Sequence, residues 1–188
     1  MDKIYILVSQ SCTNLAKFFK MFTKKPYNHV SLSSDLKTFY SFCRNYIHSP
    51  VPANFNSEEL DRGVWGKMDY IPCELYELNV TVEQKEIFDK VLDDFIKNRR
   101  KYAYNIVGLA AIYWGFNWKR ENKFVCSQFC AHVLEKMGVE LHKPVFLHTP
   151  EDFRRIDNFR LVYAGNLKDY DNLHRELSSK RESIGMFG

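Results

Sequence analysis

The sequence has no apolar run long enough to cross a membrane and no stretch typical of an export signal. Its longest apolar run, residues 104–116, falls short of the roughly 20 residues of a spanning helix and contains an asparagine and two glycines. The first residues, MDKIYILVSQSC, carry an acidic residue directly after Met1 and only a brief apolar stretch. We therefore expect residues 104–116 to form a buried core helix, and we expect a cytoplasmic protein without a transmembrane segment.

Regular cysteine spacing is also missing. The five cysteines form an odd set without the pattern of a disulfide framework, and the chain contains neither a CxxC nor an HxxxH unit. Without an export signal, disulfides are not expected, because cytosolic thiols stay reduced. We therefore expect free thiols and no metal or organic cofactor.

Strong charge bias is absent as well. Lysine and arginine total 27 against 23 aspartates and glutamates, and the basic residues are scattered, so no nucleic-acid partner is expected. Neither repeats nor a low-complexity linker divide the chain, and 188 residues with 45% hydrophobic content suit one compact core. We predict a single domain over residues 1–165 and a polar tail over 166–188, with the oligomeric state left open.

The first third of the chain predicts strands around one helix. Residues 4–10 are rich in β-branched side chains and indicate a strand, and residues 13–23 carry apolar side chains at helical spacing. Residues 29–34 and 39–43 each alternate around a turn, which predicts a hairpin. His29 therefore begins a strand.

The middle of the chain predicts a loop, a strand and a helix. The prolines and asparagines of residues 50–56 indicate an irregular surface loop that continues through residue 72. Residues 73–80 alternate as a strand does. Thr81 and Gln84 then form a capping-box pattern before a structural helix with five apolar side chains at helical spacing, Phe88, Val91, Leu92, Phe95 and Ile96.

The stretch FVCSQFCAHVLEKMG, residues 124–138, predicts a helix over 127–137 that ends at Gly138. Cys126 then lies at the helix N-terminus, where partial positive charge and free N–H groups favour a thiolate and a developing oxyanion. A nucleophile also needs a base, and the strand-borne His29 is the best placed of the six histidines. This pairing predicts a Cys–His site.

Two other interpretations of these cysteines stay open. A cysteine at a helix start is often a packing residue, and Cys130, one turn later, is better suited to the core. A zinc site would need four side chains that lack the usual spacing, Cys126, Cys130, His142 and His148.

Four histidines are expected at the surface or in loops: His48, His142, His148 and His174. The segment HTPEDF predicts a turn and a helix start capped by Thr149, and residues 159–166 predict a last strand.

Four blocks occur in a particular order: YNHVSLSSDLKTFYSF, RRKYAYNIVGL, RENKFVCSQFCAHVLEKMGV and HTPEDF. This order resembles the circularly permuted branch of the NlpC/p60 papain-like cysteine hydrolases, which includes YiiX-like and lecithin:retinol acyltransferase-like proteins. In that branch a strand-borne histidine precedes the helix-borne cysteine. The resemblance implies an α+β fold in which a small antiparallel sheet packs against helices, with the cysteine at a helix N-terminus.

The resemblance also implies roles for individual residues. Cys126 matches the nucleophile and His29 the general base, while Tyr104 matches an aromatic residue that borders the site. Gln128 stands where some relatives have glutamate, and it either orients substrate or caps the helix. The position of the third catalytic residue corresponds to Ser41.

A serine at that position orients an imidazole by a hydrogen bond but does not stabilise the imidazolium by charge. Asp35 and His48 lie in expected turns and fit the role less well than Ser41. This weaker third group leaves open a catalytically silent binding module of the same fold.

The resemblance predicts a thiol-dependent hydrolase or acyltransferase, a cysteine peptidase or amidase in kind. Its substrate is expected to be a peptide or another amide, cleaved through an acyl-enzyme intermediate. The alternative substrate is an acyl lipid ester, supported by the 15% aromatic content and the apolar segment 104–116.

Overall fold

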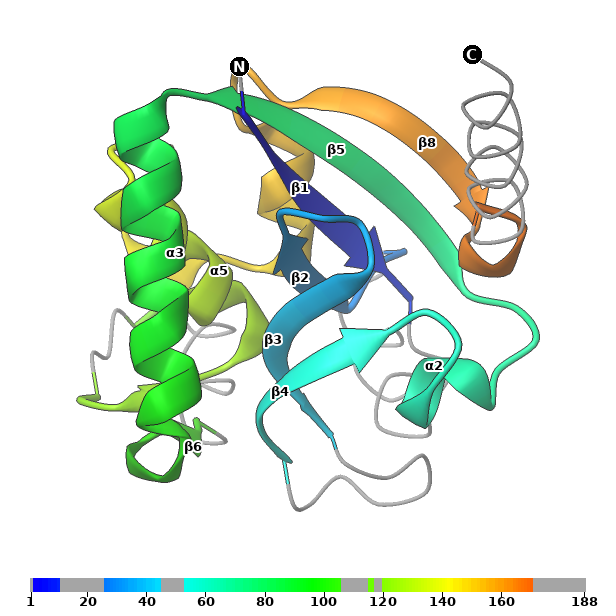
Figure 1. Ribbon diagram of the computed structural model, residues 1–188, viewed down its shortest axis with the longest axis horizontal. Helices are drawn as coiled ribbons and strands as arrows, with labels where there is room; N and C mark the ends of the chain where they lie inside the picture. The colour runs from blue at the N-terminus through cyan, green and yellow to red at the C-terminus, as the bar shows by residue number, and fades with distance from the viewer. Residues whose placement is uncertain (1, 11–25, 45–52, 106–114, 117–119, 171–188) are drawn as a thin grey trace, which may run out of the picture.

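The computed structural model describes residues 2–10, 26–44, 53–105, 115–116 and 120–170 (Figure 1). It shows a mixed α+β fold with an antiparallel sheet and a few helices. The predicted helix 13–23, residues 106–114 of the apolar segment 104–116, and the tail beyond residue 170 lie outside the described residues, as do Cys12, His48 and His174.

The elements follow the chain in this order: β1 (Asp2–Ser9), β2 (His29–Ser33), β3 (Thr38–Arg44), β4 (Ala53–Glu59), α2 (Gly63–Gly66), β5 (Pro72–Val80), α3 (Val82–Lys97), the 3₁₀ turn η1 (Arg99–Lys101), β6 (Ala103–Tyr104), β7 (Lys123–Phe124), α5 (Cys126–Lys136), the 3₁₀ segments η2 (Val145–Leu147) and η3 (Pro150–Arg155), and β8 (Arg160–Asn166). Six strands form one sheet in the order β4-β3-β2-β1-β5-β8, and all its neighbouring strands are antiparallel. The short β6 and β7 pair in parallel beside it.

The central strand β1 is buried on both faces. Ile6 and Val8 belong to one apolar cluster, and Leu7 between them belongs to another. Since successive strand residues point to opposite faces, the sheet separates two cores. Helices α3 and α5 cover the first face (Figure 1), and α2 contributes Trp65 to the second.

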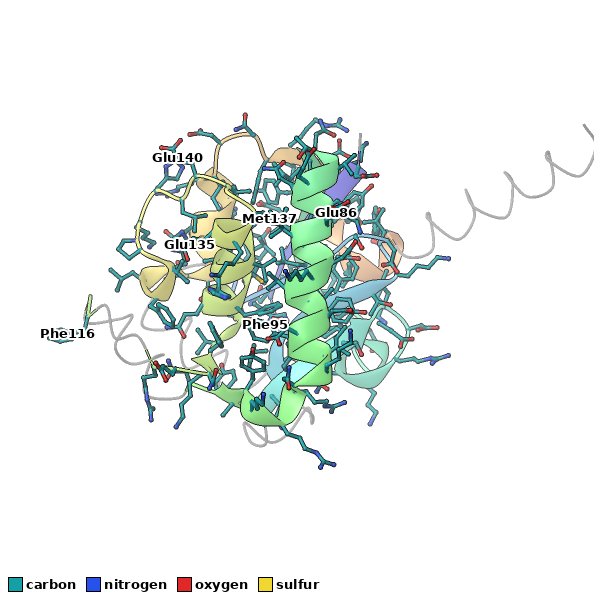
Figure 2. All side chains as sticks on the ribbon, turned by 60° about the vertical axis from the view of Figure 1, so that its left-hand side comes forward. Glu86, Phe95, Phe116, Glu135, Met137 and Glu140 are labelled. Carbon is teal, nitrogen blue, oxygen red and sulfur yellow. The ribbon has the colours of Figure 1, made fainter. Side chains whose placement is uncertain are left out.

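Aromatic rings join α3 and α5 to the sheet. The centroids of Phe95 and Phe129 are 4.9 Å apart, and both rings also contact Phe55 of β4. Figure 2 looks onto this layer, with Phe95 between the two helices. The helix–sheet contact therefore fixes α5, and with it the position of Cys126.

Most predicted elements are confirmed. The hairpin of β2 and β3, the strands β1, β5 and β8, and the helix α3 all lie where the sequence predicts them. Thr81 caps α3, accepting from the backbone N–H of Gln84, whose side chain returns to the Thr81 N–H. Gly138 follows α5 with a φ of +77°, a conformation that favours glycine and ends the helix.

The predicted surface loop before residue 60 is wrong, because residues 53–59 form β4. Its residues pair with β3, from Thr38 opposite Glu59 to Arg44 opposite Ala53. The asparagines and prolines suggested a loop, yet Ala53 and Phe55 alternate with Asn54 and Asn56 and are buried. The period of two outweighs the turn propensity of the asparagines because pairing with β3 satisfies their backbone groups.

Within the described residues, no helix combines the length and apolar character that crossing a bilayer requires. The helices α3 and α5 have 16 and 11 residues.

Replacing Phe129 by alanine is expected to lower the free energy of unfolding by about 3–5 kcal/mol, because it removes a fully buried ring from the aromatic layer. Urea denaturation followed by circular dichroism measures the loss. Val82→Ala is the control, since the Val82 side chain is 63% exposed, and it should change stability by no more than about 0.5 kcal/mol. Equal losses in both variants would contradict the layer's importance.

Candidate active site

Cys126 is the first residue of α5, as the sequence predicts, and it is buried. The residue before the helix is Val125, whose side chain offers no acceptor to the first-turn N–H groups. These donors point out of the helix start, toward which the positive end of the helix dipole also faces. The start of α5 therefore suits a sulfur anion or an oxyanion.

Gln128 caps α5 from within. Its Oε1 accepts from the backbone N–H of Val125 at 3.1 Å and from the Asn105 side chain at 3.3 Å, while its Nε2 donates to the Phe146 carbonyl at 3.1 Å. Of the two roles considered for Gln128, the structure supports capping. With its side chain buried and both ends engaged, Gln128 is not presented to a substrate.

His29 is the first residue of β2, and its ring lies among buried groups. The ring Nε2 donates to Oε2 of Glu58 in β4 at 2.8 Å, with both side chains close to 90% buried. Cys126 lies next to this imidazole and is among the groups that raise its pKa. The structure thus brings together Cys126, His29 and a carboxylate.

The charges around His29 favour its protonated form. Burial by itself lowers the pKa of the imidazole, but the charge of Glu58 and the hydrogen bonds to Cys126 and Glu58 outweigh burial and raise this pKa from 6.5 to about 10. The charge of Cys126 adds to the rise. At neutral pH the His29 imidazole is therefore protonated.

Trp65 of α2 packs against the imidazole of His29. The ring centroids of Trp65 and His29 are 6.4 Å apart at an interplanar angle of 74°, an edge-to-face contact. Trp65 is itself buried against Phe39, at 5.8 Å. This packing limits rotation of the imidazole and excludes water from the ring on that side.

Ser41 does not hold the imidazole, in contrast to the expected third catalytic residue. Its buried hydroxyl donates to the carbonyl of Val30 at 2.7 Å and so ties β3 to β2. The imidazole Nε2 instead meets Glu58. The site thus has a charged orienting group, which stabilises an imidazolium in a way that a hydroxyl does not.

The sequence reasoning missed Glu58 because it missed β4. In the observed register Phe39 is opposite Glu58 and Ser41 is opposite Asn56, so the carboxylate lies on the strand next to the predicted hairpin. The sequence signal that indicates β4 is the alternation of Ala53 and Phe55 with polar residues. A strand there would have offered Asn54, Asn56 and Glu58 on the face shared with Ser41.

Tyr104 lies beside the segment that leads to Cys126. It pairs with Phe124 through the parallel β6–β7 ladder, and its half-buried ring packs on the first apolar cluster. The structure thus places Tyr104 near the segment 124–138, which contains Cys126.

His148 lies between η2 and η3, as expected for a loop residue, but it is buried and does not lie at the surface. Its carbonyl accepts from the Ser127 hydroxyl at 2.6 Å, its Nδ1 donates to the Pro144 carbonyl at 3.1 Å, and its ring packs on Phe153. Burial lowers the pKa of its imidazole.

The HTPEDF segment leads into η3, with Thr149 at the predicted cap position. The Asp152 side chain accepts a hydrogen bond from the Thr149 N–H at 2.7 Å.

The four side chains considered for zinc do not converge. The Cys130 thiol faces the Val30 carbonyl at 3.6 Å, His142 is exposed and contacts the Arg155 carbonyl, and His148 points to Pro144. Among the described residues, no cluster of three or more histidine, cysteine, aspartate or glutamate side chains has an arrangement suited to a metal ion.

The other described cysteines are poor candidates for a nucleophile. Burial raises the pKa of Cys73 to about 12 and raises the pKa of Cys43 and Cys130 as well. These thiols stay protonated near neutral pH, and protonated thiols are weak nucleophiles.

Comparisons of the chain with protein-family models, with curated proteins and with solved structures gave no match. The function is therefore argued from the geometry of the site.

Replacing Glu58 by glutamine is expected to move the titration of His29 to lower pH, because it removes the largest group that raises the pKa of this imidazole. NMR of the histidine ring protons against pH measures the shift. Ser41→Ala is the control and should leave the titration in place. An unchanged midpoint in Glu58→Gln would contradict the ion pair.

The raised pKa also predicts how His29 affects stability. A folded-state pKa of about 10 against an ordinary 6.5 means that the protonated imidazole stabilises the fold fully below pH 6.5, and that this contribution is lost as the pH rises through about 10. The difference in unfolding free energy between the parent protein and Glu58→Gln should therefore shrink over that window.

Proposed function

We propose that the protein is a thiol-dependent hydrolase or acyltransferase, a cysteine peptidase or amidase in kind. The observation that supports this most strongly is the arrangement in which His29 lies next to Cys126, at the start of α5, and donates to Glu58. Nucleophile, base and orienting carboxylate in that order are the elements of acyl transfer.

Acylation follows from the position of each group. His29 holds the proton that the Cys126 sulfur gives up, and the sulfur attacks the carbonyl carbon of an amide or ester. The N–H groups at the start of α5 stabilise the resulting oxyanion. The intermediate then expels its amine or alcohol, which takes the proton from His29, and Cys126 is left as a thioester.

Deacylation uses the same groups in reverse. Acylation removes the negative charge of the Cys126 sulfur, one of the groups that raise the pKa of His29, so the imidazole gives up its proton more readily in the acyl-enzyme. The neutral ring then takes a proton from water or an acceptor amine, which attacks the thioester. The acid or transferred amide leaves, and the thiol is restored.

Glu58 gives the proposed site a stronger orienting group than a serine. A carboxylate fixes the imidazole ring and stabilises its charged form throughout acylation, whereas a hydroxyl supplies only the hydrogen bond. This favours a catalytic site over the silent binding module of the same fold.

The order of the site residues supports a permuted papain-like arrangement. The histidine lies on a strand of the antiparallel sheet and precedes the cysteine, which begins a later helix. We infer on this basis that the domain is of the NlpC/p60 type, with amide or peptide bonds as the first substrate class. Acyl lipid esters are the alternative.

Alkylation rates should separate Cys126 from the other thiols. We expect iodoacetamide to modify Cys126 near neutral pH at least about tenfold faster than Cys43, Cys73 or Cys130, because the protonated thiols of the latter react slowly. Peptide mass spectrometry measures each rate. His29→Ala should abolish the preference, whereas equal rates at all cysteines in the parent protein would favour a binding module.

An acyl-enzyme should form with an activated ester. Incubation with p-nitrophenyl acetate is expected to add one acetyl group to Cys126, detected by intact mass, and the adduct should decay by hydrolysis. Cys126→Ala and His29→Ala should form none, and Cys130→Ala should still form it. A longer acyl ester that reacts faster than an amide or peptide substrate would select lipid over amide chemistry. No adduct at Cys126 would contradict the proposed chemistry.

A further inference from the structure

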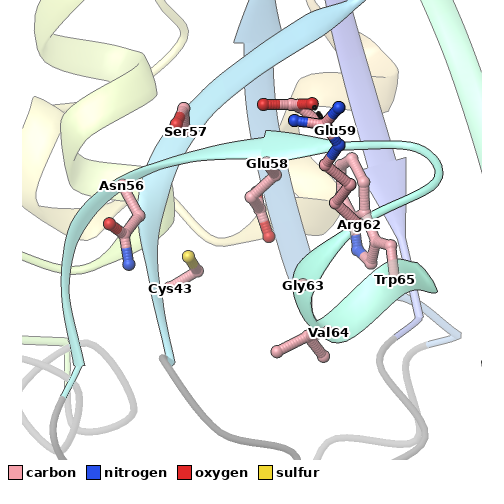
Figure 3. A pocket seen from close by; sticks show the side chains of 9 residues that line it. All are labelled: Cys43, Asn56, Ser57, Glu58, Glu59, Arg62, Gly63, Val64 and Trp65. Atoms are coloured by element: carbon pink, nitrogen blue, oxygen red, sulfur yellow. Dashed lines mark ion pairs between the residues drawn. The ribbon is translucent and has the colours of Figure 1, made fainter. Parts of the chain in front are cut away.

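The groups that touch the His29 ring on the second face of the sheet border open space. A pocket of about 180 Å³ lies between the β3–β4 ribbon and α2, and its lining includes Glu58 and Trp65 (Figure 3). An adjoining cavity gives the Glu58 side chain room for other rotamers. Firm placement of His29 therefore also requires contacts on the first face of the sheet.

A carboxylate on the first face, Glu74 of β5, is the centre of a hydrogen-bond cluster, and its side chain is only 12% exposed. Its Oε2 accepts from Nε of Arg154 at 2.6 Å and from the Tyr76 hydroxyl at 2.5 Å. Its Oε1 accepts from Nη2 of Arg154 at 2.9 Å and from the Tyr27 hydroxyl at 3.2 Å. Arg154 also donates to Glu151, and its guanidinium lies over the Tyr27 ring, 5.3 Å from the centroid. Each carboxylate oxygen of Glu74 thus accepts two hydrogen bonds.

The cluster reaches the segment that begins β2. Tyr27 lies two residues before His29 in the chain, and the Asn28 N–H between them donates to the Ser9 carbonyl at 3.1 Å. Ser9 is also the residue opposite His29 in the β1–β2 ladder. The bond from Tyr27 to Glu74 therefore holds the chain just before His29 enters the sheet.

The cluster also reaches the start of α5. Arg154 belongs to η3, and the chain just before η3 is fixed to α5, because the His148 carbonyl accepts from the Ser127 hydroxyl at 2.6 Å. Ser127 directly follows Cys126. The Glu74–Arg154 pair thus joins the segment before His29 to the segment that contacts the start of α5.

We propose that Glu74 and Arg154 are positioning residues, whose ion pair clamps the start of β2 to η3 and so fixes His29 relative to Cys126. Glu74 acts through Tyr27, and Arg154 acts through η3. The effect of this clamp on catalysis rests on the function proposed above. Its effect on His29 does not depend on a substrate.

The experiment removes the two charges separately, in Glu74→Gln and Arg154→Met, and removes one hydrogen bond in Tyr27→Phe. Two quantities are measured in each full-length variant. The first is the pH midpoint of His29 by NMR, and the second is the rate of acetylation of Cys126 by p-nitrophenyl acetate.

A second arginine pair on β5 supplies the matched control. Glu77 accepts from Nε of Arg160 at 3.0 Å, and the Arg160 side chain is 68% exposed, against 31% for Arg154. Glu77 is opposite Tyr5 of β1, farther from the strand end that carries the site than Glu74. Exposed ion pairs contribute little to stability. Glu77→Gln and Arg160→Met should therefore leave the midpoint in place and change the acetylation rate by less than about twofold.

Loss of the clamp is expected to lower the His29 midpoint in both charge variants, because it weakens the contacts that raise this pKa. A direct effect of charge would differ, since loss of the positive Arg154 would raise the midpoint and loss of the negative Glu74 would lower it. Acetylation of Cys126 should slow at least about tenfold in both, because a misplacement of about 1 Å can cost a factor of about 100. Tyr27→Phe should slow acetylation about 2- to 10-fold, the loss typical of one hydrogen bond.

Opposite midpoint shifts in Glu74→Gln and Arg154→Met would overturn the proposal, as would an unchanged midpoint in either or equal losses in the control variants. If Arg154→Met does not fold, Arg154→Lys keeps the charge without the two-nitrogen pairing and should show the same two losses. Failure of the proposed function looks different. In that case the parent protein forms no acetyl adduct, while the His29 midpoint still falls in both charge variants.

Discussion

The double-sided burial of β1 is the constraint on which the other layers depend. With Ile6 and Val8 on one face and Leu7 on the other, the strand requires a cover on each side of the sheet. Helices α3 and α5 supply the first cover and α2 part of the second. The site draws on both layers, because Cys126 comes with α5 whereas Trp65 comes with α2. A strand end, where His29 lies, is the place at which groups from the two faces meet.

Much of this arrangement could be predicted from local patterns, and the reasons differ from element to element. The capping box of Thr81 and the spacing of Phe88, Leu92 and Phe95 depend on neighbours along the chain, so they specify α3 directly. Cys126 at a helix start follows in the same way. Glu58 depends on which strands pair and in which register, and a single sequence carries that information weakly.

The same distinction explains the roles assigned to the polar residues. Ser41, Gln128 and His148 are polar residues in suggestive positions, yet their side chains or backbone carbonyls mainly satisfy buried backbone and side-chain groups. Burying polar groups without partners costs free energy, so most buried polar side chains serve to satisfy other buried polar groups. His29 and Glu58 differ because they place opposite charges in a buried position next to a thiol, and burying charges carries a desolvation cost.

Val125 gives α5 an incomplete beginning. A serine or aspartate at a helix N-cap typically stabilises a protein by about 1 kcal/mol over an apolar residue, because it accepts a hydrogen bond from the first turn. A cap of that kind would also occupy the donors beside the Cys126 sulfur. The Val125 side chain accepts no hydrogen bond from the first turn of α5, and this costs local stability. The first-turn N–H groups therefore stay available to an anion on or next to the Cys126 sulfur.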